Sequence, residues 1–189
     1  MFDFDFVEEI ISTLENGGLI LYPTDSVWAI GCDATNVEAI KKVLALKQRK
    51  EGRGLVLLAE DLKMVGKYVD YIPPRIDMLL VYHTRPLTII YDLAENLPKE
   101  VLGPKNTVAM RTAQDDFCKN IVQKFGKPLV ATTANIDNSE IPLHFGAINS
   151  DIVEAVDYVV RFRRDEKKDG SLSVIARMGE DGELEFLRE

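Results

Sequence analysis

Apolar residues near the N-terminus recur at the three- and four-residue spacing of an amphipathic helix, so the sequence predicts a helix there. Asp5 followed by Glu8 matches a capping pattern for its start, and Gly17 and Gly18 match its end. The next residues, 19–22, are continuously apolar, as in a short strand that is buried on both faces. The helical stripe consists of Phe6, Val7, Ile10, Ile11 and Leu14.

A second helix and strand repeat this order. Thr35 and Glu38 have the spacing of a capping box, and the apolar stripe that follows ends near Lys47. Gly54 then precedes an apolar run over residues 55–58. We therefore expect a helix that ends near Lys47 and a strand directly after the glycine.

The rest of the chain continues to alternate strand-like runs with helical patterns. Thr112 with Asp115 predicts the start of one helix, Gly126 predicts its end, and polar residues 132–139 predict a loop. This alternation predicts an α/β fold in a single domain over residues 1–189, with a mixed parallel and antiparallel sheet. Helices are expected over residues 60–68, 73–81 and 113–125, and strands over 87–91, 107–111, 128–131, 158–160, 173–176 and 184–187.

Composition places the chain among ordinary globular proteins and limits its partners. Its 189 residues are 46% apolar and 29% charged, with a net charge of −8, which argues against general binding to nucleic-acid backbones. Cys32 and Cys118 stand far apart and form neither a disulfide pattern nor a metal-binding pattern. The acidic N-terminus and the lack of a long apolar run predict a cytoplasmic protein with no membrane span.

The commonest catalytic signatures are missing from this sequence. His83 and His144 lie outside any zinc-hydrolase pattern, and no GxSxG motif accompanies them. The chain also lacks a GxxxxGK(S/T) loop and a GxGxxG motif after a strand, so bound phosphates would have to be neutralised by cationic side chains. Residues 41–54 supply such side chains against a single Glu51: Lys41, Lys42, Lys47, Arg49, Lys50 and Arg53.

Three polar segments at the ends of predicted elements carry candidate site residues. Lys47 and Arg49 follow a helix, where cationic side chains also interact favourably with the helix dipole. Thr133 and Asn135 are residue types that readily form turns, which is their alternative explanation. The joint occurrence of the segments favours one site that holds the phosphates of a nucleotide. The segments are residues 23–26, 47–49 and 133–135.

Motifs along nearly the whole chain resemble those of the YrdC-like threonylcarbamoyl-AMP synthases. These enzymes have a strand, a PT(D/E)T motif, a KxR motif, a strand that ends in arginine, a TSAN loop and a closing segment, in the same order as here. The resemblance implies a single α/β domain with a twisted mixed sheet and helices around a large concave cleft. The matching segments are residues 18–34, 47–49, 107–111, 127–135, 173–175 and 187–188.

The resemblance also implies a reaction and a set of site residues. YrdC-like synthases join L-threonine, bicarbonate and ATP into threonylcarbamoyl-AMP and release pyrophosphate, which begins the threonylcarbamoyl modification of a tRNA adenosine. Mg²⁺ is expected with ATP, and no residue is assigned as its ligand. The implied roles are catalysis for Lys47 and Arg49, nucleotide binding for Arg49, Arg53, Thr107, Thr133, Asn135 and Arg188, and threonine binding for Ser26, Arg111, Ala131 and Ser173.

Several positions depart from the family's pattern and leave two alternatives open. Arg53-Gly54 stands in place of an Asn-Pro-like pair, Leu58 in place of a polar contact, and Asp137-Asn138 in place of a Ser-Gly pair. These changes are compatible with a related enzyme that has the same ATP site and another amino-acid or carbamoyl substrate. The second alternative is an RNA-binding module without this activity. Besides ATP, L-threonine and bicarbonate, the expected partners of the synthase are tRNA or tRNA-modification proteins.

Overall fold

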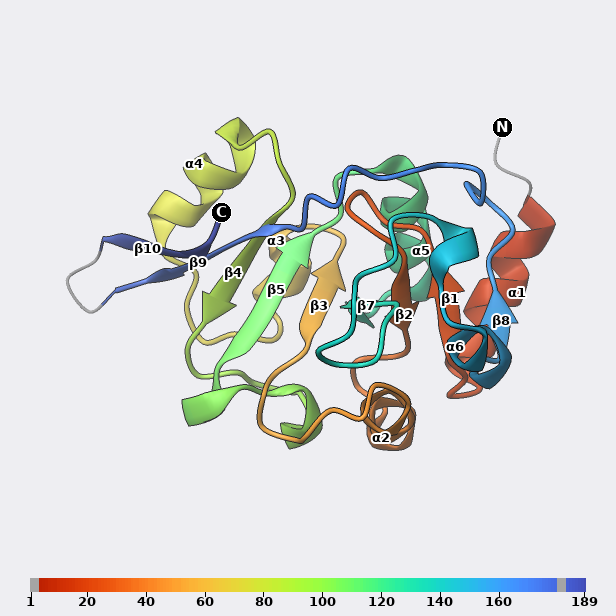
Figure 1. Ribbon diagram of the computed structural model, residues 1–189. Coiled ribbons are helices and arrows are strands. Elements are labelled where there is room, and N and C mark those ends of the chain that lie inside the picture. Colours follow the sequence, from red (N-terminus) through yellow and green to blue (C-terminus); the bar gives the residue numbers. More distant parts are fainter. Residues whose placement is uncertain (1–3, 180–182) are drawn as a thin grey trace.

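Helices and strands alternate along most of the chain in the computed structural model, which describes residues 4–179 and 183–189 (Figure 1). The α-helices are α1 (Phe4–Glu15), α2 (Val37–Leu46), α3 (Leu62–Val65), α4 (Pro74–Tyr82), α5 (Asp116–Phe125) and α6 (Ser150–Ala155). The 3-10 helices are η1 (Lys99–Val101), η2 (Pro104–Asn106) and η3 (Phe145–Ala147). The strands are β1 (Ile20–Tyr22), β2 (Ala29–Gly31), β3 (Val56–Ala59), β4 (Leu87–Tyr91), β5 (Val108–Thr112), β6 (Leu129–Val130), β7 (Thr132–Thr133), β8 (Tyr158–Val159), β9 (Val174–Met178) and β10 (Leu184–Arg188).

The strands form two sheets that lie side by side (Figure 1). The larger sheet has the order β10-β9-β4-β5-β3-β6, in which β3 with β5 and β4 with β9 pair in parallel and the other neighbours pair antiparallel. The smaller sheet has the order β7-β2-β1-β8, and only β1 with β8 is parallel among its pairs of described strands. The predicted mixed α/β class is therefore confirmed, and the mixed pairing is divided between two sheets.

The chain passes from the larger sheet to the smaller one within a few residues. Strand β6 pairs with β3, the next strand β7 pairs with β2, and Ala131 lies between them. The backbone N–H of Ala131 donates to the carbonyl oxygen of Val56 at 2.8 Å, which holds this crossing against β3. Polar residues just after the crossing consequently lie beside the strand ends of both sheets.

The helices cover the sheets along their apolar faces. Helix α1 packs against α5 and β8. In Figure 1 it lies beside the smaller sheet, at the end of the molecule opposite α4. The largest fully buried aromatic side chains, those of Trp28 and Tyr22, belong to the smaller sheet and its connection. Trp28 contacts Phe145 with ring centroids 5.0 Å apart, and it is therefore a core residue.

Three predicted helix starts are wrong by one or more residues. Helix α1 already includes Phe4, so Asp5 is not its cap. Asn36 rather than Thr35 caps α2, because its side-chain oxygen accepts from two backbone N–H groups of the first turn. Asp115 rather than Thr112 caps α5, since Thr112 is still the last residue of β5. Thr112 stands three residues before this capping position, too far from the first turn for its side chain to serve as the cap.

Two other predicted elements differ in extent. The helix expected over residues 60–68 is only the single turn Leu62–Val65 within this described region. The loop expected from Thr132 begins instead with the two-residue strand β7, which pairs with β2. Among the described residues, no helix has the length and apolar character that crossing a membrane requires. Cys32 and Cys118 are both buried, and neither forms a disulfide.

Candidate functional site

A cavity of about 310 Å³ lies against the larger sheet and brings most of the predicted site residues together. Nine of the eleven line it, whereas Lys47 and Asn135 lie behind its wall. The cavity adjoins a second one of about 630 Å³, with which it shares Ile90, Pro104 and Thr107. The nine lining residues from the prediction are Ser26, Arg49, Arg53, Thr107, Arg111, Ala131, Thr133, Ser173 and Arg188.

The floor of this cavity is one face of the larger sheet. Val56 is paired with Ala109, and Ala109 with Ile90, and all three line the cavity. Because side chains alternate along a strand, the residues between them point to the other face. This floor is apolar, a property that suits the flat face of a nucleotide base. Residues of the same strands that are buried in the core are Leu57, Ile89 and Met110.

Arg111 is the penultimate residue of β5 and lies beside the turn that follows β1. It is only 4% exposed, and its guanidinium donates to the carboxylate of Asp25. Burial disfavours the charged guanidinium, but the adjacent Asp25 carboxylate outweighs burial and raises the pKa of Arg111 above its usual value. The other oxygen of Asp25 accepts the backbone N–H of Gln114 at 3.3 Å. The Asp25 carboxylate thus fixes a charged arginine in the cavity wall.

Arg188 reaches the same cavity from the last strand. Its side chain donates to the carbonyl oxygen of Ser173 at 2.7 and 3.0 Å and to the Ser173 hydroxyl at 3.1 Å. That hydroxyl also forms a 2.8 Å hydrogen bond with Thr88. Burial and the nearby charge of Arg111 lower the pKa of Arg188. In the part of the chain that the structure describes, no carboxylate pairs with Arg188, so its positive charge is available to an anionic ligand.

Arg49 and Arg53 share one carboxylate, that of Asp137. Arg49 Nη1 lies 3.0 and 3.2 Å from the two Asp137 oxygens, and Arg53 Nη1 lies 3.2 Å from one of them. Arg49 Nη2 also donates to the carbonyl oxygens of Arg53 and Gly54, at 3.2 and 2.8 Å. Arg49 is therefore held on two sides, whereas the Arg53 side chain is 54% exposed and has, among the described residues, a single hydrogen bond, to Asp137.

The Lys47 side chain is 1% exposed and points into the loop that follows β7. Its ammonium donates to the carbonyl oxygens of Thr133 and Asn135, at 2.8 and 2.6 Å, and lies 3.8 Å from Asp137. Burial and the charge of Arg49 lower its pKa to about 8, although Asp137 opposes this shift. The Thr133 hydroxyl donates to the Asn135 side-chain oxygen at 2.6 Å. Lys47 and Asn135 thus shape the loop from behind the cavity.

The backbone at Gly54 differs from what a proline would allow. Its φ of +64° lies in the left-handed region, whereas proline fixes φ near about −65°. A side chain there would also lie 3.3 Å from the backbone of the neighbouring Gly103, which lines the same cavity. Leu58, another position that departs from the family's pattern, is fully buried and is not among the lining residues.

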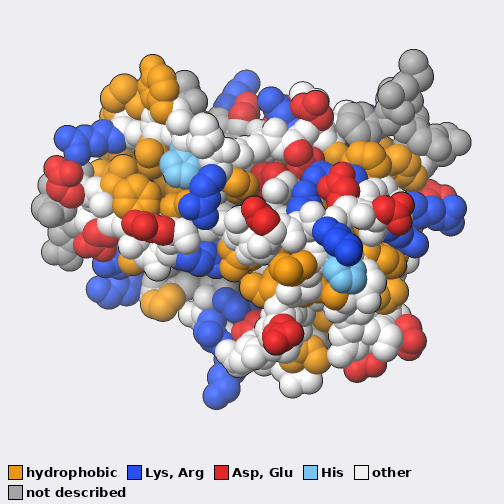
Figure 2. Space-filling view, turned by 45° about the horizontal axis from the view of Figure 1, so that its top comes forward, with side chains coloured by type: hydrophobic (Ala, Val, Ile, Leu, Met, Phe, Trp, Pro, Cys, Tyr) orange, Lys and Arg blue, Asp and Glu red, His pale blue; other side chains and the backbone are white. Residues whose placement is uncertain are grey.

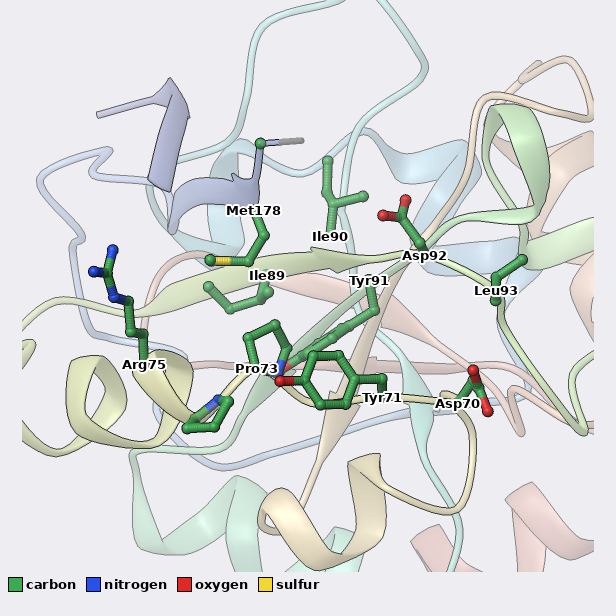
Figure 3. A pocket seen from close by; sticks show the side chains of 12 residues that line it. Asp70, Tyr71, Pro73, Arg75, Ile89, Ile90, Tyr91, Asp92, Leu93 and Met178 are labelled. Carbon is green, nitrogen blue, oxygen red and sulfur yellow. The ribbon is translucent and has the colours of Figure 1, made fainter. Parts of the chain in front are cut away.

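A cavity of about 620 Å³ near α4 has a different character (Figure 3). Tyr71, Pro73 and Met178 stand around it, with Ile89 and Tyr91 contributed by β4 (Figure 3). Its surface is mostly apolar, and none of the predicted site residues lines it. The smaller cavity is therefore the candidate site, because it gathers four arginines and several hydroxyl groups.

The comparisons with known proteins agree with this geometry. The sequence profile Sua5_yciO_yrdC, whose description is "Telomere recombination", matches residues 12–189. A curated "Threonylcarbamoyl-AMP synthase" from Pseudoalteromonas translucida (strain TAC 125) is 34% identical over 163 residues, which is 85% of this chain and 87% of the relative. The chain belongs to the Sua5/YciO/YrdC family.

Solved structures of this family share the fold. A Sua5 structure from P. abyssi, complexed with L-threonine, superposes with a TM-score of 0.90 at 21% identity and matches all of this chain. The match spans 55% of that Sua5 chain, so the present chain covers about half of its length. YciO from E. coli superposes with a TM-score of 0.85 at 19% identity, over 99% of this chain and 90% of YciO. The predicted Sua5/YciO/YrdC-type fold is thereby confirmed.

Sequence reasoning missed the carboxylates that hold the arginines of this family member. Asp25 lies inside a quoted motif, but no role followed from the motif alone, and Asp137 stood out only as a departure from the pattern. Each carboxylate pairs with an arginine 84 to 88 residues away in the chain. The only sequence signal for these ion pairs was an acidic residue in a loop that was otherwise expected to bind phosphates.

Proposed function

We propose that this Sua5/YciO/YrdC-family protein is an L-threonylcarbamoyladenylate synthase that joins L-threonine, bicarbonate and ATP and releases pyrophosphate. The product would serve the threonylcarbamoyl modification of a tRNA adenosine. The observation that carries the proposal is the convergence of Arg49, Arg53, Arg111 and Arg188 on one cavity whose described lining residues include no carboxylate. The name of the 34% identical relative supports the same reaction.

The substrates of this reaction are anions, and the cavity offers separate cationic groups for them. Arg53 has unused donors and is half exposed, so it suits the phosphates of ATP. Arg188 carries an uncompensated charge on the other side of the cavity, where we place a second nucleotide contact. The apolar floor of Val56, Ala109 and Ile90 lies between them and would support the nucleoside.

Threonine would lie near Arg111 and the hydroxyl groups of Ser26 and Ser173. The Asp25 carboxylate keeps Arg111 charged and immobile, which suits recognition of the amino acid's carboxylate. Ser26 lines the cavity and shares a 3.1 Å hydrogen bond with the buried Thr24 hydroxyl. The backbone of Ala131 completes this end of the cavity.

In the proposed reaction, the amine of threonine and bicarbonate first form a carbamate with loss of water, and a carbamate oxygen then attacks the α-phosphorus of ATP. The new bond joins that oxygen to phosphorus, and the bond from phosphorus to the pyrophosphate oxygen breaks with its electron pair. The arginines stabilise the charge that grows on the leaving pyrophosphate. We assign Lys47 and Asn135 to fixing the loop that contains Thr133, because both lie behind the cavity wall.

Mg²⁺ would accompany ATP in this reaction and neutralise part of the phosphate charge. Among residues 4–179 and 183–189, the structure contains no group of three or more acidic, histidine or cysteine side chains that could hold a metal. Asp25 and Asp137 are the carboxylates behind the cavity wall, and arginines already occupy both. The residues present therefore fit an ion carried by the phosphates and water.

An assay of pyrophosphate release tests the function directly. The purified protein should release pyrophosphate from ATP only when threonine and bicarbonate are both present, and mass spectrometry should identify threonylcarbamoyl-AMP. Equal release without threonine would contradict the threonine assignment. Release that requires bicarbonate and a different amino acid would identify the related enzyme that the departures leave open.

The alternative of an RNA-binding module receives no support from the charge distribution. The net charge is −8, and Figure 2 shows Lys and Arg interspersed with Asp and Glu on the face that it displays. Binding to a nucleic-acid backbone needs a clustered excess of cationic side chains. A gel-shift titration that finds tight, strongly salt-dependent tRNA binding without pyrophosphate release would favour the module.

A further inference from the structure

The carboxylate of Asp137 lies at the centre of the basic segment that forms one wall of the cavity. Lys47, Arg49 and Arg53 approach it with nitrogen-to-oxygen distances of 3.8, 3.0 and 3.2 Å. Its side chain is 9% exposed, so water screens its charge only weakly. In the described part of the chain, no other carboxylate contacts Arg49 or Arg53.

Most of the local structure does not depend on this carboxylate. Lys47 keeps three acceptors without it, namely the carbonyl oxygens of Thr133 and Asn135 and the Asn135 side-chain oxygen. Arg49 keeps two backbone acceptors. The backbone N–H of Asp137 also donates to the Lys47 carbonyl oxygen at 2.9 Å, a bond that any side chain at this position preserves. Replacing the carboxylate by an amide therefore removes charge and leaves the wall in place.

Arg53 is the group whose behaviour the carboxylate controls most. The only hydrogen bond of its side chain among the described residues goes to Asp137, and more than half of that side chain is exposed at the cavity. A phosphate in the cavity and the Asp137 carboxylate would attract the same guanidinium from opposite sides. They would also repel each other, because both are negative and little water separates them.

We propose that Asp137 is an affinity-determining residue: it is a resident anion that competes with the phosphates of ATP and of pyrophosphate for Arg53 and Arg49. The inference rests on the assignment of this cavity to ATP in the proposed function. When pyrophosphate leaves, the Asp137 carboxylate forms its ion pairs with the Arg49 and Arg53 guanidinium groups again. The positive charges of Lys47, Arg49 and Arg53 are then not left without a compensating negative charge. Asp137 therefore weakens substrate binding and speeds release of the product.

Direct binding measurements on the whole chain test this competition. The titrants are MgATP, inorganic pyrophosphate and inorganic tripolyphosphate, measured by calorimetry for the wild type, Asp137→Asn and a control, Asp33→Asn. Asp33 suits the control because it is a buried carboxylate, paired with Lys127 at 2.8 Å, that does not line the cavity. We expect Asp137→Asn to bind all three anions about tenfold more tightly at low salt, with a smaller gain at high salt.

Kinetics add a readout that a merely structural role would not change. Asp137→Asn should lower KM for ATP and make pyrophosphate a stronger product inhibitor, whereas Asp33→Asn should change stability alone. Unchanged or weaker anion binding by Asp137→Asn would overturn the inference about Asp137. If the wild type still binds ATP in that case, the proposed function is not contradicted. Tighter tripolyphosphate binding without any ATP binding would support the resident anion and reject the nucleotide assignment. No binding of any anion by either protein would reject both.

Discussion

The ammonium nitrogen of Lys47 lies 2.6 Å from the carbonyl oxygen of Asn135, 88 residues further along the chain. This bond, with a second one to Thr133, ties the end of α2 to the loop after β7. Because an ammonium with 1% exposure has lost nearly all its water, these carbonyl oxygens replace its hydration. Lys47 therefore shapes one wall of the cavity without lining it.

The stability contribution of Lys47 should depend on pH. Burial lowers its pKa to about 8 in the folded chain, whereas an unfolded lysine titrates near about 10.4. Between these values the unfolded chain holds a proton that the folded chain lacks, so the contribution to stability increases with pH. The difference in unfolding free energy between wild type and Lys47→Met should rise by roughly 3 kcal/mol across this interval.

Urea denaturation of both proteins at several pH values between about 7.5 and 10.5 measures this difference. Other titrating groups are common to the two proteins, so their effects cancel in the comparison. A difference that stays constant with pH would show that Lys47 keeps an ordinary pKa in the folded chain.

The buried pair of Arg111 and Asp25 should behave as a coupled unit. Either Arg111→Met or Asp25→Asn alone leaves its partner buried without full compensation, which should lower the free energy of unfolding by about 3 kcal/mol. The double variant removes both charges and should lose less than the sum of the two, by at least about 1 kcal/mol. Chemical denaturation of the four proteins tests the coupling, and strictly additive losses would contradict it.

Arg188 should contribute to catalysis through its uncompensated charge. Arg188→Met removes charge-assisted hydrogen bonds to an anionic ligand, so kcat/KM for pyrophosphate release should fall about 30-fold or more. Arg177→Met is the matched control, because Arg177 lies on the neighbouring strand β9 and is paired with Glu185 at 2.7 Å. Equal losses in the two variants would indicate a general effect of charge.

Two glycines should differ in their tolerance of a methyl group. A Cβ at Gly31 would lie 2.6 Å from the Tyr22 ring and 3.0 Å from the Val130 carbonyl oxygen, so Gly31→Ala should cost about 3 kcal/mol. Gly126 has a φ of +74° at the end of α5 with open space around it, so Gly126→Ala should cost only about 1 kcal/mol. Thermal denaturation compares them, and similar losses would contradict the close contact at Gly31.

Local patterns predicted the elements well and their exact starts less well. The apolar stripe before Lys47 marked α2 correctly, because helical periodicity is written directly in the sequence. The sequence pattern predicts a cap at Thr35, yet the Thr35 hydroxyl donates to Asp33 at 2.7 Å and Asn36 occupies the capping position. Both residue types suit a cap, so the choice depended on a neighbour's side chain.

The candidate site was predictable as a set of residues but not as a layout. The motifs point to Arg49 and Arg111, and the aligned position of a departure points to Arg53; all three line the cavity. Whether a cation points into a cavity or into a loop depends on tertiary contacts, and therefore the burial of Lys47 did not follow from its motif. The same reason applies to the pairing of Asp137 with the basic segment, which joins residues far apart in the chain.

The alternation of side chains in β3, β4 and β5 bears on how this protein can diverge. Positions such as Val56 and Ile90 contact the ligand space, and the adjacent positions Leu57 and Ile89 hold the interior together. A change of chemical preference can therefore accumulate at the positions that line the cavity while the buried ones stay constrained by packing. Substitutions on the cavity face of this sheet could therefore change the substrate while the hydrophobic core stays the same.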